Sequence, residues 1–137
     1  MSKLLDSRHY LPLRFGVALG YTIFVLIILL QPARQPVIDL HIAQEPPSLE
    51  RELWFALGHV VLFTALSALW YWGFSGHLPL RAAALLAFCV ALLIGVGSEL
   101  AQLMTTSRNL SLLDLSANAF GGLLLILLIY GISRRRR

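Results

Sequence analysis

The chain has 137 residues, of which 58% are hydrophobic and only 13% are charged, and its formal net charge is +4. Soluble domains are nearer half apolar and about a quarter charged, so a soluble domain of this length could not bury so much apolar surface. The composition therefore excludes an ordinary water-soluble domain and predicts a protein that lipid covers.

Four apolar stretches are long enough to cross a hydrocarbon core about 30 Å thick, at a rise of about 1.5 Å per residue. They cover residues 15–30, 53–74, 82–104 and 112–132. The connections between them are too short to hold another domain. We therefore predict an all-α fold, in which residues 1–137 form one integral membrane bundle of four transmembrane helices.

The first stretch follows three basic residues, Lys3, Arg8 and Arg14, as the apolar core of a signal peptide would. The sequence after it, Leu-Gln-Pro-Ala-Arg at 30–34, offers no small-x-small cleavage site. We expect an uncleaved anchor.

Basic residues are distributed unevenly over the two ends of the spans. One side carries eight of them, namely Lys3, Arg8, Arg14, Arg81 and Arg134 to Arg137, and the other carries only Arg34, Arg51 and Arg108. Because segments rich in Lys and Arg stay on the cytoplasmic side, we predict that both termini are cytoplasmic. The C-terminal basic run directly follows a span and lacks interleaved aromatic residues, so it predicts contact with anionic lipid and no nucleic-acid partner.

Polar residues inside the second and third spans gather near the predicted outer side. In the second span, His59, Phe63 and Ser67 recur at intervals of four and so share one helix face. In the third span, a stripe of small residues that permits close helix packing continues on the same face into a polar group. The stripe is Ala87, Ala91 and Gly95, and the polar group is Glu99 with Ser98 and Gln102 beside it.

The fourth span carries Asp114 near its start and Asn118 one turn later on the same face. Because the third span runs outward and the fourth returns inward, Glu99, Asp114 and Asn118 lie at similar depths, within about 10 Å of the outer boundary, as does His59. A charged side chain facing lipid costs about 2.5 to 3.5 kcal/mol at the bilayer centre. We therefore expect these side chains to face one another, inside the bundle or in an outward-open cleft.

Most of these residues also have a structural explanation. Ser111 and Asp114 resemble a capping box at the start of the fourth helix. Gln102 and Asn118 could form hydrogen bonds between helices. Arg108, in the turn between the last two spans, is the natural counter-ion, and a structural ion pair and contact with an anionic ligand are equally plausible for it. His59 and Glu99 cap nothing, which favours a functional role for that pair.

The elements His59-x-x-x-Phe63, Glu99-x-x-Gln102, Arg108, Asp114-x-x-x-Asn118 and Gly121, in this order, resemble the signature of the VanZ-like family. The resemblance covers roughly residues 50–127. The family often has an acidic residue and a lysine just ahead of the histidine, where this chain has Phe55 and Ala56. The resemblance implies a bacterial inner-membrane protein, in a family named for a member that confers resistance to the glycopeptide teicoplanin. It implies no reaction.

The first functional hypothesis is a binding protein without catalytic activity. Its outward-facing cleft would hold an envelope lipid, a cell-wall precursor or a lipophilic glycopeptide. The expected ligand-binding residues are His59, Glu99, Gln102, Arg108, Asp114 and Asn118.

The second hypothesis is an intramembrane enzyme acting on an envelope lipid, with His59, Glu99 and Asp114 as candidate catalytic residues. The sequence has no nucleophile elbow and no His-Glu-x-x-His helix, which favours binding over catalysis. The same three residues could in principle hold a divalent ion, but we predict no metal and no cofactor. The third hypothesis is a structural subunit that joins partner membrane helices, or a second copy of itself, through its small-residue stripes.

Overall fold

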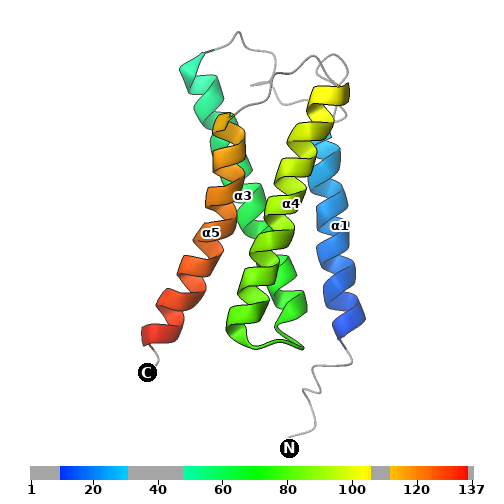
Figure 1. Cartoon of the computed structure of the whole chain (residues 1–137), viewed down its shortest axis with the longest axis vertical. Coiled ribbons are helices and arrows are strands. Elements are labelled where there is room, and N and C mark those ends of the chain that lie inside the picture. The colour runs from blue at the N-terminus through cyan, green and yellow to red at the C-terminus, as the bar shows by residue number, and fades with distance from the viewer. Residues whose placement is uncertain (1–9, 31–47, 106–111, 136–137) are drawn as a thin grey trace, which may run out of the picture.

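The structure is a computed structural model and describes residues 10–30, 48–105 and 112–135. Four helices make up almost all of this part of the chain: α1 (Leu11–Leu30), α3 (Leu49–Phe74), α4 (Leu80–Thr105) and α5 (Leu112–Arg135) (Figure 1). Each is long and apolar enough to cross a membrane. The predicted all-α fold with four such helices is therefore confirmed.

Two helices begin about one turn earlier than predicted, because polar and proline residues suit a first helical turn. α1 begins at Leu11, where Pro12 lies in the first turn and needs no hydrogen-bond partner for a backbone N–H. α3 begins at Leu49, because the Ser48 side chain accepts a hydrogen bond from the backbone N–H of Arg51 (3.1 Å) and caps the helix. Both helices thus extend beyond the strictly apolar stretch.

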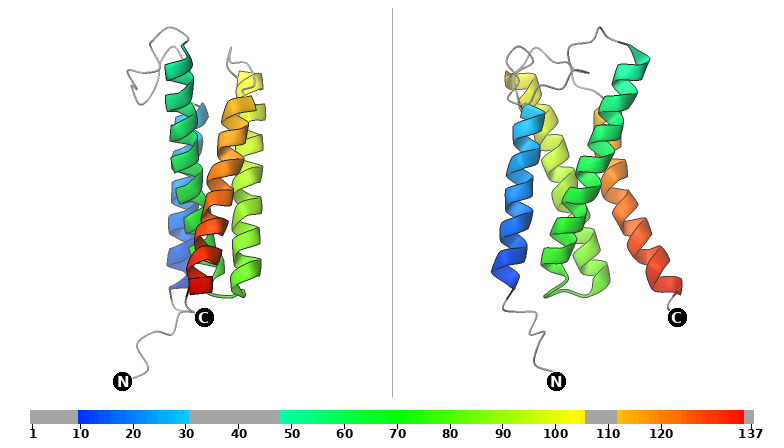
Figure 2. Two further views of the ribbon diagram at one scale, coloured as in Figure 1. Left: turned by 90° about the vertical axis from the view of Figure 1, so that its left-hand side faces the viewer. Right: turned by 180° about the vertical axis from the view of Figure 1, so that it is seen from behind.

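α3 and α4 form the middle of the bundle. They are joined by the short turn 75–79, pack against each other, and each contacts both α1 and α5. Within the described residues α1 and α5 do not touch, and they flank the central pair on opposite sides (Figures 1 and 2). The C-terminal end of α5 moves away from the other helices, whereas its first turns lie against the bundle.

The two ends of the bundle differ in charge. We call the end that holds the start of α3, the end of α4 and the start of α5 the polar end, and the opposite end the terminal end (Figure 1). All four acidic residues of the described chain lie at the polar end: Glu50, Glu52, Glu99 and Asp114. Four of its five basic residues lie at the terminal end: Arg14, Arg81, Arg134 and Arg135. The start of α1 and the end of α5 share one end of the bundle, as predicted, and the membrane side that this end faces stays a prediction.

Most of the apolar surface faces outward. In the most apolar window of each helix only 17% to 28% of the residues are buried inside the bundle, so the surface around the helices is apolar over most of its length. The buried core is small, with Phe63 and Leu66 on α3 and Val25 on α1 at its centre. This is the arrangement expected when lipid, and not water, covers the protein.

Candidate functional site

A hydrogen bond between two buried polar residues lies at the centre of the polar end. Nδ1 of His59 on α3 lies 2.7 Å from Oδ1 of Asn118 on α5. The two residues are only 7% and 1% exposed. An amide oxygen can only accept, so the proton of this bond is on His59 Nδ1, and in the neutral ring the lone pair is on Nε2.

Close helix packing holds this pair in place. A Cβ atom at Gly121 would lie 2.6 Å from the carbonyl oxygen of Val60, so α5 can approach α3 this closely only because position 121 is glycine. The hydroxyl of Thr64 lies 2.7 Å from the Val60 carbonyl oxygen and 3.0 Å from that of Gly121, and is shared between the two helices. These contacts lie within about one and a half turns of His59 on α3 and within one turn of Asn118 on α5.

Two further contacts fix the imidazole and the amide. The His59 ring is parallel to the ring of Phe63, with an interplanar angle of 3° and a centroid distance of 6.3 Å. A Cβ atom at Gly95 of α4 would lie 3.2 Å from both Cβ and Nδ2 of Asn118, so α4 closes the cluster on its third side. The sequence predicted that His59 and Phe63 share one face of α3 and that Gly95 and Glu99 share one face of α4. These two faces contact each other at the cluster.

Asp114 is the second partner of the imidazole. Its Oδ2 lies 4.0 Å from His59 Nε2, and the side chains of His59 and Asp114 are 9% and 24% exposed. Asp114 lies in the first turn of α5, where a carboxylate also suits the positive end of the helix dipole. Asp114 therefore lies both at the start of a helix, as the capping interpretation requires, and beside the histidine, as the functional interpretation requires.

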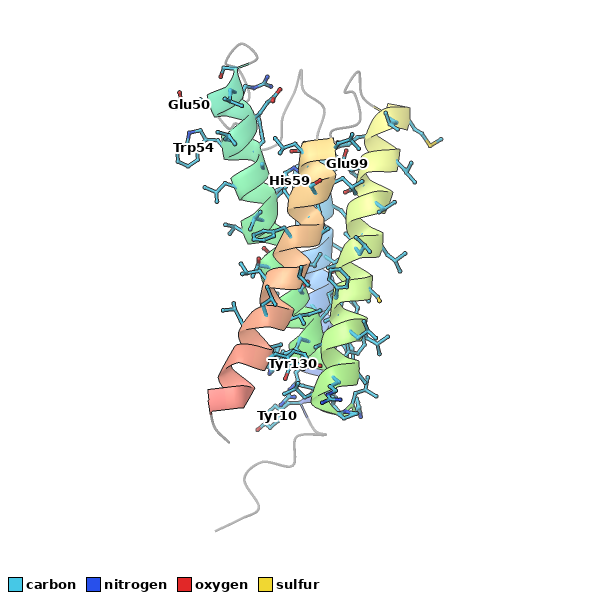
Figure 3. The ribbon with its side chains drawn as sticks, turned by 60° about the vertical axis from the view of Figure 1, so that its left-hand side comes forward. Tyr10, Glu50, Trp54, His59, Glu99 and Tyr130 are labelled. Carbon is cyan, nitrogen blue, oxygen red and sulfur yellow. The ribbon has the colours of Figure 1, made fainter. Side chains whose placement is uncertain are left out.

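Glu99 on α4 is 2% exposed, so its carboxylate is inside the bundle. It lies at almost the same level along the bundle as His59, whereas Tyr10 and Tyr130 mark the opposite end (Figure 3). The structure thus brings Glu99, His59, Asp114 and Asn118 to one level of the bundle, which is the arrangement that helix rise and chain direction predicted.

Gln102 makes a contact that joins two helices. Its Nε2 donates a 2.7 Å hydrogen bond to the backbone carbonyl of Leu29, in the last turn of α1. The last four carbonyls of a helix have no partner within the helix, so this side chain satisfies one of them. Gln102 therefore forms a hydrogen bond between helices, which is the structural role that the sequence allowed for it. A contact of Gln102 with a ligand stays a prediction.

Some predicted residues lie outside the described part of the chain. Arg108, the expected counter-ion, and Ser111, the expected capping partner of Asp114, are among them. Their predicted roles remain as stated from the sequence.

The sequence did not predict that two polar atoms in or near the cluster would be buried without a hydrogen-bond partner. Nδ2 of Asn118 and Oγ of Ser67 are buried and have no hydrogen-bond partner among the described residues. The interhelical contact of Thr64 with Gly121 was also missed. Thr64 is not on the predicted face of His59, Phe63 and Ser67, but a hydroxyl inside an apolar span was a usable signal. The sequence predicts which face is buried but not which buried atoms find partners.

The described residues contain no group of three His, Cys, Asp or Glu side chains placed to hold a metal ion. A hollow of about 280 Å³ exists near the start of α3, lined by Glu50, Leu53, Trp54 and Leu57 of that helix. None of the predicted site residues lines it.

Comparisons of the chain with protein-family models, with curated proteins and with solved structures found no match. The resemblance to the VanZ-like family is therefore carried by the sequence motifs alone.

Proposed function

We propose that this chain is a VanZ-like protein of the bacterial inner membrane, with both termini cytoplasmic and its polar end facing outward. There it binds the polar group of a cell-envelope lipid, a wall precursor or a lipophilic glycopeptide, in a role of the teicoplanin-resistance type. The observation that supports this best is the buried pair His59–Asn118 with Asp114 4.0 Å from the imidazole.

Polar groups inside a membrane bundle are costly, so their concentration at one level needs a reason. A simple helix-joining role would require hydrogen bonds between the helices and no more, and Thr64 and Gln102 already provide such bonds. His59 and Asp114 add two groups able to ionise, and the side chain of Asp114 is 24% exposed at the polar end. That exposure gives a ligand a route to the imidazole.

The proposal is tested in intact cells by replacing His59 with Gln and Asp114 with Asn, and measuring an envelope phenotype together with membrane abundance. Glu50→Gln is the matched control, because Glu50 is an exposed acid at the same end. We expect both site variants to lose the phenotype at normal abundance and the control to keep it. A parallel loss of abundance in both site variants would show that the cluster only stabilises the bundle.

One observation favours a second candidate, an intramembrane enzyme that acts on an envelope lipid. Because Asn118 holds the proton on Nδ1, the neutral imidazole presents Nε2 as a general base on the side of Asp114. Purified protein would then convert a labelled envelope lipid, and His59→Gln would abolish conversion. Intact substrate across the main lipid and lipid-linked classes would exclude this function.

The subunit hypothesis is less well supported by the packing. Ala87 and Ala91, two residues of the predicted small-residue stripe, are 0% and 1% exposed inside this chain. A partner helix or a second copy would therefore have to use a different surface.

A further inference from the structure

We propose that the terminal end of the bundle holds a site for an anionic phospholipid, whose phosphate is bound by the guanidinium of Arg14 beside the indole of Trp72. The site lies at the opposite end of the bundle from the cluster of His59 and Asn118, so this inference does not rest on the function proposed above.

Three segments of the chain meet at the Arg14 side chain. Arg14 lies in the first turn of α1 and is half-buried against the end of α3. Its Cζ lies 5.3 Å from the centroid of the Trp72 ring, and its Nη1 lies 3.4 Å from the Trp72 carbonyl oxygen. A Cβ atom at Gly76 would lie 3.3 Å from Nη1, so the turn between α3 and α4 also passes close by. The guanidinium is thus held in one place at this end of the bundle.

Most of the hydrogen-bonding capacity of this guanidinium is unused. An arginine side chain has five N–H donors. Among the described residues it makes one polar contact, to the Trp72 carbonyl, and 3.4 Å is long for a hydrogen bond. Nε is buried without a partner, so a ligand would be met by the two terminal nitrogens. These nitrogens donate side by side, which is the geometry that binds two oxygens of one phosphate.

A capping role for Arg14 accounts for little of this arrangement. A cation suits the negative end of the α3 dipole, and α3 has no basic residue of its own in its last turn. However, the Trp72 carbonyl already accepts a shorter hydrogen bond, 2.9 Å long, from the hydroxyl of Ser75. The carbonyl therefore does not need Arg14, and the charge of the guanidinium still calls for an anion.

The described chain offers no carboxylate to Arg14. All four acidic residues of the described ranges lie at the polar end. In the whole sequence, the side with the termini carries eight basic residues and a single acid, Asp6. The potential at this end therefore attracts a negative group from outside the bundle.

The surroundings of Arg14 favour a lipid over a soluble anion. Its neighbours Leu13 and Val17 on α1 are apolar and are 58% and 40% exposed, so acyl chains can lie along the helix directly below a bound headgroup. Tyr10, labelled at this end in Figure 3, and Trp72 are partly exposed rings of the kind that lie at headgroup level. Basic groups between membrane helices at this level are typical sites for anionic headgroups.

The first test measures lipid bound to the full chain, purified in mild detergent and mixed with equal amounts of phosphatidylglycerol and phosphatidylcholine, by native mass spectrometry. Both lipids carry a phosphate, but the choline cation neutralises it and is repelled by the basic end. We expect phosphatidylglycerol to be preferred by about tenfold, the effect of roughly one charge-assisted hydrogen bond. Arg14→Gln should abolish the preference. Equal retention of both lipids by the wild-type chain would overturn the proposal.

Arg51→Gln is the matched control. The Cζ of Arg51 also lies 5.3 Å from the centroid of an aromatic ring, that of Phe55, but it lies at the polar end between Glu50 and Glu52. This substitution removes the same charge and the same kind of ring contact, so the lipid preference should persist. Loss of the preference in Arg51→Gln as well as in Arg14→Gln would overturn the assignment to the terminal end.

A second control separates a defined site from diffuse attraction. Arg134→Gln removes one positive charge from the same end, on α5, which does not contact α1 within the described residues. We expect a clearly smaller loss of preference than in Arg14→Gln. Equal losses would show that the basic end attracts anionic lipid only through its overall charge, and would overturn the site.

Arg14→Lys keeps the charge and is the variant least disturbing to the fold. A lysine lacks the paired donors of a guanidinium, so we expect a preference between those of the wild type and Arg14→Gln. An undiminished preference would overturn the paired geometry. Thermal unfolding provides an independent measurement: phosphatidylglycerol should raise the unfolding temperature of the wild type and of Arg51→Gln more than that of Arg14→Lys, because a ligand of the folded state stabilises it. An equal rise in all three chains would also contradict binding at Arg14.

Discussion

His59 donates a 2.7 Å hydrogen bond to Asn118, a residue 59 positions later in the chain, and so joins α3 to α5 inside the bundle. In the chain, α4 lies between these two helices, so no turn joins α3 directly to α5. The contact therefore depends on the packing of α3, α4 and α5 together, and it reports on the integrity of the polar end.

Asn118→Ala should destabilise the bundle by about 1 to 3 kcal/mol, because it leaves the buried Nδ1–H of His59 without an acceptor. In a double-mutant cycle with His59→Ala, we expect a coupling energy of about 0.5 to 1.5 kcal/mol, the range of hydrogen bonds between membrane helices. Reversible unfolding in mixed micelles measures both quantities. Ser116→Ala, at an exposed position on the same helix, is the control. Purely additive effects of the two substitutions would show that the hydrogen bond contributes nothing.

Gly121→Ala should cost about 1 to 3 kcal/mol, because its Cβ would lie 2.6 Å from the Val60 carbonyl oxygen and would force α5 away from α3. The separation would also lengthen the contact of Thr64 with Gly121 and move Asn118 away from His59. Gly97→Ala is the matched control, since a Cβ atom there meets nothing within 4 Å and an alanine favours the helix. The same unfolding assay applies. Equal stability of the two variants would contradict the close approach described here.

The helices and the level of the site follow from simple features of the sequence. Apolar length predicted the four helices, and the regular rise of about 1.5 Å per residue placed His59, Glu99, Asp114 and Asn118 at one depth. Intervals of four residues predicted the buried faces of α3 and α4. These quantities depend on positions along one helix, which is why a single sequence reveals them.

Contacts that depend on the rotation of one helix against another were not predictable in this way. α1 carries no strong pattern, yet Trp70 of α3 donates a 3.1 Å hydrogen bond to the Thr22 hydroxyl, and Gln102 reaches the Leu29 carbonyl. The sequence identified Gln102 as part of the polar group but could not show that its partner is a backbone atom of the first helix. Side-chain spacing indicates a face but does not identify the neighbour of that face.

Gln102→Leu should loosen the last turn of α1, because the Leu29 carbonyl loses its partner in an apolar environment. We expect faster amide hydrogen exchange at the C-terminal end of α1, measured by mass spectrometry in detergent or nanodiscs. The effect should be confined to that region if the other contacts of the bundle persist. Leu103→Ala, at a half-exposed neighbouring position, should leave the exchange unchanged. Unchanged exchange in Gln102→Leu would show that water, and not Gln102, satisfies the carbonyl.

The orientation in the membrane can be decided with single cysteines. Cys89, the only cysteine of the chain, is first replaced by Ser, and a new cysteine is then placed at Glu50 on the polar end or at His77 in the turn between α3 and α4. Because basic residues dominate the terminal end, we expect a membrane-impermeant maleimide to label Glu50→Cys in intact cells and His77→Cys only after permeabilisation. Labelling of both positions after lysis controls for their accessibility. The opposite pattern would place His59, Glu99 and Asp114 near the cytoplasm. It would then exclude an extracytoplasmic ligand while leaving the geometry of the cluster intact.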